Sequence, residues 1–126
     1  MIPSQDSIRI LAVDDHPMFR EGLVMVLATQ PDMTLVAEAS NGREAIQRFR
    51  EHRPDITLMD LQMPVMNGLE AMVAIHNEFP DAKIIILTTY ESDLQRAMEL
   101  GARAYLLKTH LSRELLWTIR AVQAGK

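Results

Sequence analysis

Short apolar runs alternate with helical stripes of apolar residues five times along the chain. The first stripe has the spacing of one helix face, with apolar side chains at Phe19, Leu23, Val26 and Leu27. The short runs have the length of strands and cover residues 8–13, 33–39, 55–60, 83–88 and 104–107. Five strand–helix units in alternation predict an α/β fold, in which a five-stranded parallel sheet carries helices on both faces.

Three positions carry residues that are typical of helix N-termini. Asn41 is followed three residues later by Glu44, a pair whose side chains can satisfy free backbone N–H groups of a first turn. Ser92 and Gln95 have the same spacing, so a helix is expected to begin at Ser92. Ser112 is expected to open the last helix in the same way.

The composition excludes several kinds of site. The 126 residues include no cysteine, which excludes disulfides, thiolate zinc sites and a thiol nucleophile. The length predicts a single domain over residues 1–126. Residues 1–7 form a polar N-terminal segment, and no apolar run approaches the roughly 20 residues of a membrane span. A cytoplasmic protein without membrane contact is therefore expected.

The charge balance argues against nucleic-acid binding by this chain. Thirteen Lys and Arg residues against 17 Asp and Glu residues give a formal net charge of −4, whereas binding to a phosphate backbone requires a basic face. If the protein acts on DNA, another segment must bind it.

Four of the predicted strands run into polar residues that can take part in chemistry. In chain order these are Asp14 with Asp15, Asp60, Thr88 and Lys108. In open parallel sheets, ligands bind outside the carboxyl ends of the strands. One aspartate alone at such a place is usually a helix cap or a turn residue. Five polar groups at one edge, with the first and third strands as neighbours, instead predict a binding site.

Three carboxylates at one edge of a sheet repel one another. At an effective dielectric constant of about 20, each close pair costs on the order of 4 kcal/mol, so such a cluster takes up protons or holds a cation. Oxygen ligands without cysteine favour Mg²⁺, or Mn²⁺, over Zn²⁺. Lys108 and Thr88 would suit a phosphoryl group. Asp60 has no acidic neighbour and is the predicted nucleophile, which leaves Asp14 and Asp15 to hold metal.

At these residues the sequence resembles the receiver domain of two-component response regulators, from about Ile8 to Ala124. Residues 13–17, Val-Asp-Asp-His-Pro, resemble the acid-pair loop of the LuxR/NarL-type transcription factors. The other motifs that carry the resemblance are residues 60–64 with 67–68, residues 87–88 and residues 101–108. The resemblance implies a flavodoxin-like, doubly wound fold with strand order 2-1-3-4-5.

The resemblance also implies different roles for the acidic residues. Asp60 would accept a phosphoryl group from a sensor histidine kinase. Asp15, Asp60 and the backbone carbonyl of Gln62 would coordinate Mg²⁺, and Asp14 would act through water. These residues would thus form the phosphoacceptor and its metal site.

A conformational switch is a further implication of the resemblance. Thr88 and Lys108 would contact the phosphorylated aspartate, and Tyr105 would change rotamer with it. The added charge of about −2 would bias the loop and helix after the fourth strand between two states. The chain departs from many receivers at Thr109, which stands where they have a proline after the lysine.

The predicted last helix carries one aromatic residue away from its core stripe. Trp117 points about 200° away from the core residue Leu115, at 100° per residue. In the family, the first and last helices and the face of the fourth helix serve dimerisation or contact with an output domain. Arg113, Trp117 and Arg120 are therefore candidate interface residues of a homodimer formed on phosphorylation. An exposed tryptophan without a function is the alternative.

Two other functions fit the sequence less well. A phosphohydrolase of the haloacid-dehalogenase type needs Asp-x-Asp after the first strand, where this chain has Asp14-Asp15-His16, and it usually needs a cap over its substrate. A nucleotide-binding protein needs a glycine-rich loop, which is missing after every predicted strand. The four histidines show no metal-ligand spacing, and His16 is expected at the surface.

The sequence therefore predicts a signalling domain rather than an enzyme. A linker to an absent C-terminal helix-turn-helix domain is expected to begin at residues 125–126. DNA binding and transcription regulation would belong to that domain.

Overall fold

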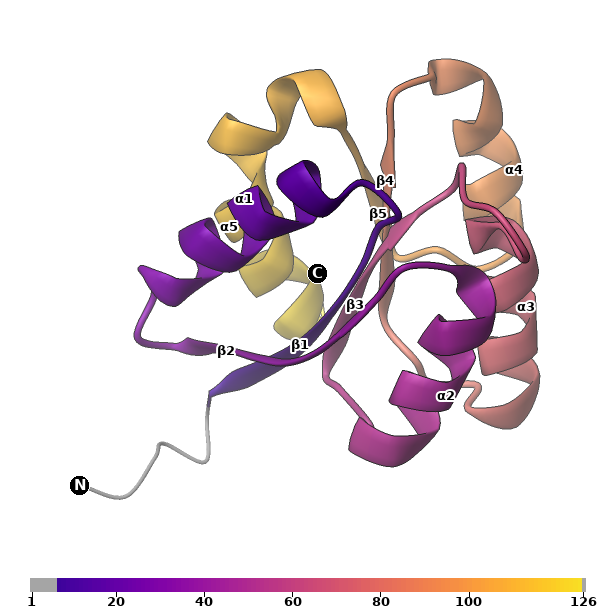
Figure 1. Ribbon diagram of the computed structural model, residues 1–126, viewed down its shortest axis with the longest axis horizontal. Helices are drawn as coiled ribbons and strands as arrows, with labels where there is room; N and C mark the ends of the chain where they lie inside the picture. Colours follow the sequence, from indigo (N-terminus) through magenta and orange to yellow (C-terminus); the bar gives the residue numbers. More distant parts are fainter. Residues whose placement is uncertain (1–6, 126) are drawn as a thin grey trace.

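Five parallel strands form one sheet (Figure 1), and a computed structural model describes residues 7–125 of the chain. The strands are β1 (Ile8–Val13), β2 (Met33–Ala39), β3 (Ile56–Asp60), β4 (Ile84–Thr88) and β5 (Ala104–Leu107). They lie in the order β2-β1-β3-β4-β5, which confirms the expected doubly wound fold. β3 and β4 each begin one residue later than predicted. Of the expected polar segment 1–7, residues 1–6 lie outside the described residues, as does Lys126.

Helices cover both faces of the sheet. α1 and α5 pack on one face, and α2, α3 and α4 pack on the other (Figure 1). The helices are α1 (Pro17–Ala28), α2 (Gly42–His52), α3 (Gly68–Glu78), α4 (Leu94–Glu99) and α5 (Leu111–Gln123), with short 3-10 helices at Glu91–Asp93 and Lys108–His110. Over residues 7–125, no helix is both long and apolar enough to cross a membrane.

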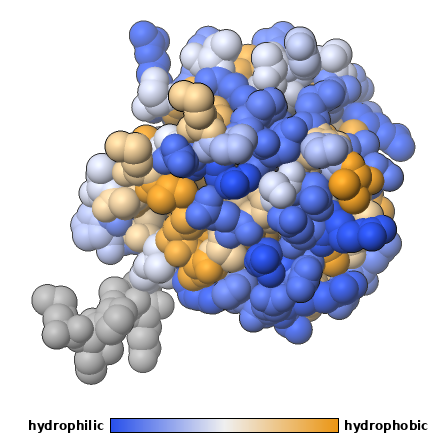
Figure 2. All heavy atoms as spheres, in the orientation of Figure 1, coloured by the Kyte–Doolittle hydropathy of each residue, from blue (hydrophilic) through white to orange (hydrophobic). Residues whose placement is uncertain are grey.

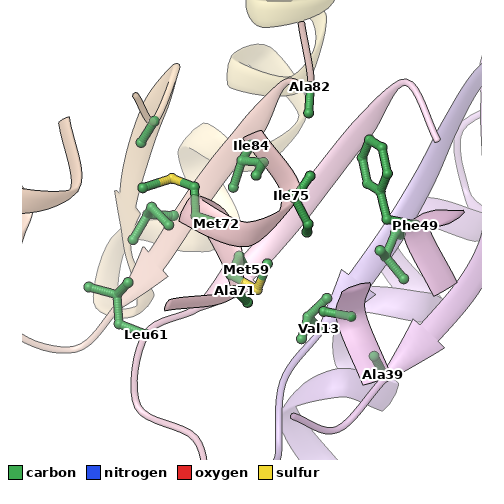
Figure 3. Close-up of a cluster of buried hydrophobic side chains, with 14 of the residues drawn as sticks. Val13, Ala39, Phe49, Met59, Leu61, Ala71, Met72, Ile75, Ala82 and Ile84 are labelled. Carbon is green, nitrogen blue, oxygen red and sulfur yellow. The ribbon is translucent and has the colours of Figure 1, made fainter. Parts of the chain in front are cut away.

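Apolar side chains of the central strands β1, β3 and β4 alternate between two hydrophobic cores. In β4, Ile84 and Ile86 point toward α2 and α3, whereas Ile85 and Leu87 point toward α1 and α5. Figure 3 shows the first core, where the Phe49 ring of α2 lies close to Ile75 and Ala82. The four β4 residues are fully buried, because a strand with helices on both faces has no solvent-facing side. The cores thus hold the strands in a register that places their carboxyl ends at one edge.

The predicted helix starts have different outcomes. Asn41 caps α2, since its side chain accepts a hydrogen bond from the Glu44 backbone N–H, which confirms that prediction. The expectation for Ser92 is wrong, because Ser92 lies inside the 3-10 helix that runs directly into α4. The expectation for Ser112 is also wrong, because the backbone already turns at Lys108 and α5 begins at Leu111 without a side-chain cap.

One residue that the pattern places on the buried face of α1 is partly exposed. Val26 is 40% exposed, whereas Leu23 and Leu27 are buried. Its side chain lines a groove between α1 and α5 that also includes Phe19 and Leu115. α5 does not cover this side of α1, so the apolar stripe is wider than the surface that it buries.

The start of α3 approaches the end of β3 very closely. Asn67 caps α3 in a reciprocal pair of hydrogen bonds with Glu70, and the Gly68 backbone N–H donates to the Leu61 carbonyl at 3.0 Å. A Cβ atom at Gly68 would overlap the backbone carbonyl oxygen of Asp60. Gly68 therefore allows the loop after Asp60 to fold back against the strand.

We expect Gly68→Ala to lower the free energy of unfolding by about 1–3 kcal/mol, because backbone atoms must shift to accommodate the methyl group. Gly22→Ala is the matched control, since Gly22 lies inside α1 and a Cβ there would have no neighbour within 4 Å. That change should stabilise the protein by up to about 1 kcal/mol. Urea unfolding of the two variants measures both effects, and equal stability of Gly68→Ala and wild type would contradict the close approach.

Candidate functional site

The structure brings the predicted acidic residues together at the carboxyl edge of the sheet. β1 pairs directly with β3, so Asp14 and Asp60 lie on neighbouring strand ends. Asp14 is fully buried and Asp60 is 2% exposed. Asp14, Asp15, His16 and Asp60 each offer one possible ligand atom, and these four atoms all lie within 4.8 Å of one another. The cluster therefore concentrates negative charge in a largely buried place.

Lys108 reaches the cluster from the end of β5. Its Nζ atom lies 2.8 Å from Asp14 Oδ2 and 3.5 Å from Asp60 Oδ2. The same ammonium group lies 4.3 Å from the centroid of the Phe19 ring, where the ring quadrupole attracts a cation. Because its side chain is only 14% exposed, Lys108 is held among its partners. With all three aspartates ionised, the cluster and Lys108 together carry a net charge of −2.

Asp60 has an unusual environment for a carboxylate. Its pKa is raised to about 6, mainly by burial; the Lys108 charge and the Gln62 backbone N–H lower the pKa, and the charges of Asp14 and Asp15 raise it. Its Oδ1 atom accepts only a long hydrogen bond of 3.4 Å from that N–H. Its Oδ2 atom is buried without a hydrogen-bond partner. At neutral pH the carboxylate is therefore ionised but poorly stabilised.

The loop after β1 is held by its own hydrogen bonds. The Arg20 side chain donates to the Asp14 backbone carbonyl and to Glu38 on β2. The His16 backbone N–H donates to Asp14 Oδ1 at 2.8 Å. Sequence reasoning missed Arg20, and it missed the contact of Phe19 with Lys108. The contacts of Arg20 with Glu38 and of Phe19 with Lys108 join separate elements, so no local pattern could reveal them.

The other predicted site residues have different surroundings, and of these the Gln62 backbone N–H contacts the cluster, at Asp60 Oδ1. The Thr88 hydroxyl is fully buried and is engaged with Tyr90, donating to its carbonyl and accepting from its N–H, both at 3.1 Å. The Gln62 side chain donates to Asp93 beside α4 at 3.3 Å. Tyr105 is 47% exposed on β5. Thr109 follows Lys108 through a trans peptide bond.

The donor set fits a hard divalent cation. The buried Asp60 Oδ2 and Asp15 Oδ1 atoms have no hydrogen-bond partner, and a buried oxygen without a partner is costly. Carboxylate oxygens are the preferred ligands of Mg²⁺ and Mn²⁺. A divalent cation would also balance the two excess negative charges. Asp14, Asp15 and Asp60 are therefore suited to hold such an ion.

The candidate interface residues on α5 differ in their surroundings. Trp117 is 74% exposed and lines a shallow groove with Met98, Tyr105 and Glu114. Arg113 is also exposed. Arg120 is instead paired within the chain, because its guanidinium group forms two 2.9 Å hydrogen bonds to Asp32 before β2.

A second exposed apolar surface lies on α1, where Met18 is 86% and Met25 71% exposed. In the view of Figure 2, apolar side chains gather mainly on the side of α1 and β2.

Comparisons with known proteins agree on one family. The model of the response regulator receiver domain matches residues 10–120. Transcriptional regulatory protein LiaR of Bacillus subtilis is 44% identical over 121 residues, which cover 94% of this chain and 57% of LiaR. Response regulator protein VraR of Staphylococcus aureus is 37% identical over 122 residues, which cover 95% of this chain and 58% of VraR.

A solved structure gives the same result. The crystal structure of a LuxR-family two-component response regulator from Aurantimonas sp. superposes with a TM-score of 0.91 at 38% identity, and the match covers 95% of this chain and 87% of the other. The chain spans less than two thirds of the length of the curated relatives LiaR and VraR.

We expect Asp60→Asn to stabilise the protein at pH 7.5 in the absence of divalent cations, by up to about 3 kcal/mol. The folded-state pKa of Asp60, about 6, lies above its ordinary value of 3.8. The stability that this group contributes is thus complete below pH 3.8 and is lost as the pH rises through 6. The neutral asparagine avoids that loss, so the difference from wild type should disappear near pH 4.

Urea unfolding with a chelator present, at pH values from 4 to 8, measures this difference. Asp81→Asn is the control, because Asp81 is exposed and its replacement should change the stability by less than about 0.5 kcal/mol. A constant difference between Asp60→Asn and wild type at all pH values would contradict the assignment.

Proposed function

The chain belongs to the receiver-domain family of response regulators, and we propose that it accepts a phosphoryl group on Asp60 from a sensor histidine kinase. A receiver domain is a signalling domain rather than a classical enzyme. The observation that carries the proposal is the buried Asp60 Oδ2 atom, which has no hydrogen-bond partner and lies 3.5 Å from the Lys108 ammonium group. An ionised carboxylate oxygen that accepts no hydrogen bond retains its nucleophilic lone pairs.

In the proposed reaction, a carboxylate oxygen of Asp60 forms a bond to the phosphorus of a phosphohistidine. The phosphorus–nitrogen bond breaks, and the imidazole nitrogen keeps the electron pair. Asp15, Asp60 and the Gln62 carbonyl would hold a divalent cation, with Asp14 acting through water. Mg²⁺, or Mn²⁺, would supply positive charge to the phosphoryl oxygens. Lys108, already placed between the two buried aspartates, would bind a phosphoryl oxygen from another side.

The proposed switch begins at Thr88. Its hydroxyl is satisfied by Tyr90 in the unphosphorylated protein, and it would turn to a phosphoryl oxygen once Asp60 is modified. The Tyr90 backbone would then lose both hydrogen bonds. Since Tyr90 directly precedes the 3-10 helix and α4, this loss would release the segment, and Tyr105 would move with it.

The proposed output is control of transcription through a C-terminal helix-turn-helix domain. The relative LiaR is named a transcriptional regulatory protein, and this chain matches 57% of its length. We propose that phosphorylation promotes a homodimer, with Arg113, Trp117 and Arg120 as interface residues. DNA binding would belong to the further domain, because this chain carries a net charge of −4.

We expect a phosphoryl adduct on wild-type protein after incubation with acetyl phosphate and Mg²⁺, and no adduct when a chelator replaces Mg²⁺. Asp60→Asn should give no adduct, because its amide is not a nucleophile. Asp81→Asn is the control and should react like wild type. Intact-protein mass spectrometry measures the adduct. An adduct that persists in Asp60→Asn would contradict the proposed acceptor.

We expect Trp117→Ala to weaken self-association of the phosphorylated protein about tenfold or more, because exposed tryptophans at interfaces contribute strongly to binding. Phosphorylation of Asp60 itself should not change. Val73→Ala is the matched control, since Val73 is a partly exposed apolar residue on α3. Sedimentation equilibrium in acetyl phosphate and Mg²⁺ measures the association, and identical dimerisation of Trp117→Ala and wild type would exclude this surface.

A further inference from the structure

The backbone around His16 points its imidazole ring at the acid pair. Pro17 restricts the preceding residue to extended conformations, and His16 has φ −95° and ψ 105°. His16 occupies the N-cap position of α1 but forms no side-chain capping hydrogen bond. Its Nδ1 atom instead lies 3.0 Å from Asp14 Oδ1 and 3.2 Å from Asp15 Oδ1. The imidazole ring therefore contacts the acidic cluster and does not cap the helix.

The distance from Nδ1 to Asp15 Oδ1 is close to the edge of a metal coordination shell. Ligand atoms lie about 2.1 Å from a small octahedral cation. At that bond length, two adjacent ligands are about 3.0 Å apart. The Nδ1 atom keeps this distance from one oxygen of each carboxylate. A cation bound directly to Asp15 Oδ1, with Asp14 acting through water, could thus accept Nδ1 without a large movement of the ring.

A separate observation shows that the cluster needs a further partner. Asp60 is 2% exposed, and its Oδ2 atom has no hydrogen-bond partner. His16 belongs to the same group of possible ligand residues as Asp60. A cation within the group would satisfy the buried oxygen and bring the imidazole nitrogen into the same shell.

We propose that His16 Nδ1 is an additional ligand of the cation site and that it favours cations with a higher affinity for imidazole nitrogen, such as Ni²⁺ and Co²⁺, relative to Mg²⁺. This inference rests on the proposed function of the same pocket. Imidazole suits transition metals, whereas Mg²⁺ prefers oxygen ligands and keeps several waters. The His16 side chain is 63% exposed, so Nε2 can carry the ring proton in contact with water while Nδ1 donates its lone pair.

Calorimetric titration of tag-free protein with MgCl₂ and with NiCl₂ tests the proposal. His16→Gln keeps a polar side chain but removes the imidazole, and it removes no helix cap. We expect this change to weaken Ni²⁺ binding at least tenfold and to change Mg²⁺ binding less than twofold. His52→Gln on α2 is the control for other histidines and should leave both affinities unchanged.

A spectroscopic measurement detects the proposed bond directly. Electron spin echo modulation of the Mn²⁺-loaded protein should show coupling to ¹⁴N in wild type and in His52→Gln, and no such coupling in His16→Gln. If the coupling persists in His16→Gln, or if Ni²⁺ and Mg²⁺ affinities fall equally, the proposal is wrong.

The same titrations distinguish a failure of the His16 proposal from a failure of the proposed metal site. Asp60→Asn should weaken binding of both cations. If Mg²⁺ binds wild type and depends on Asp60 while the nitrogen coupling is missing, only the role of His16 fails. If Asp60→Asn leaves both affinities unchanged, the cations bind elsewhere, and both the metal site and the role of His16 fail.

Discussion

The burial of like charges at the end of the central strands is the constraint on which the site depends. β1 and β3 are neighbours in the middle of the sheet, and they end at Asp14 and Asp60, which are almost inaccessible to water. Two carboxylates in such a place cannot both ionise without a nearby positive charge. Lys108 supplies one charge, and it contacts Asp14 more closely than Asp60. Burial raises the pKa of Asp60 to about 6 despite the opposing charge of Lys108, and its Oδ2 atom has no hydrogen-bond partner.

The two hydrophobic cores make this arrangement possible. Strands that are buried on both faces cannot shift their register without moving apolar side chains between the cores. The carboxyl edge is therefore a rigid platform, and the free energy that burial of the apolar side chains contributes offsets the cost of burying the charges. Gly68 adds a second rigid element, because its close approach to the Asp60 carbonyl holds the following loop in place.

The segments beside this platform are held more weakly. Two hydrogen bonds of 3.1 Å connect Thr88 to Tyr90, and one of 3.3 Å connects Gln62 to Asp93, in the segment before α4. α4 itself has only six residues, so it depends on its packing for stability. A change of charge at Asp60 therefore occurs on a rigid part of the structure, and the segment before α4 can move in response. This division suits a domain that reports its own modification.

Local patterns in the sequence were sufficient to predict the strands to within one residue, a parallel α/β sheet with helices on both faces and the cap at Asn41, because periodicity and capping depend on residues close together in the chain. The doubly wound strand order followed from the family resemblance. Local patterns also indicated that acidic residues end the first and third strands, and the motifs around Asp60 and Lys108 identified the family. Only the tertiary structure decided that Lys108 lies against Asp14 and Phe19 and that His16 faces two carboxylates. It also decided that Val26 is partly exposed and that Ser92 lies within a 3-10 helix. These features depend on how separate elements pack against one another, or on how the backbone turns between them. The contacts that stabilise the packing are made between residues that are distant in the sequence.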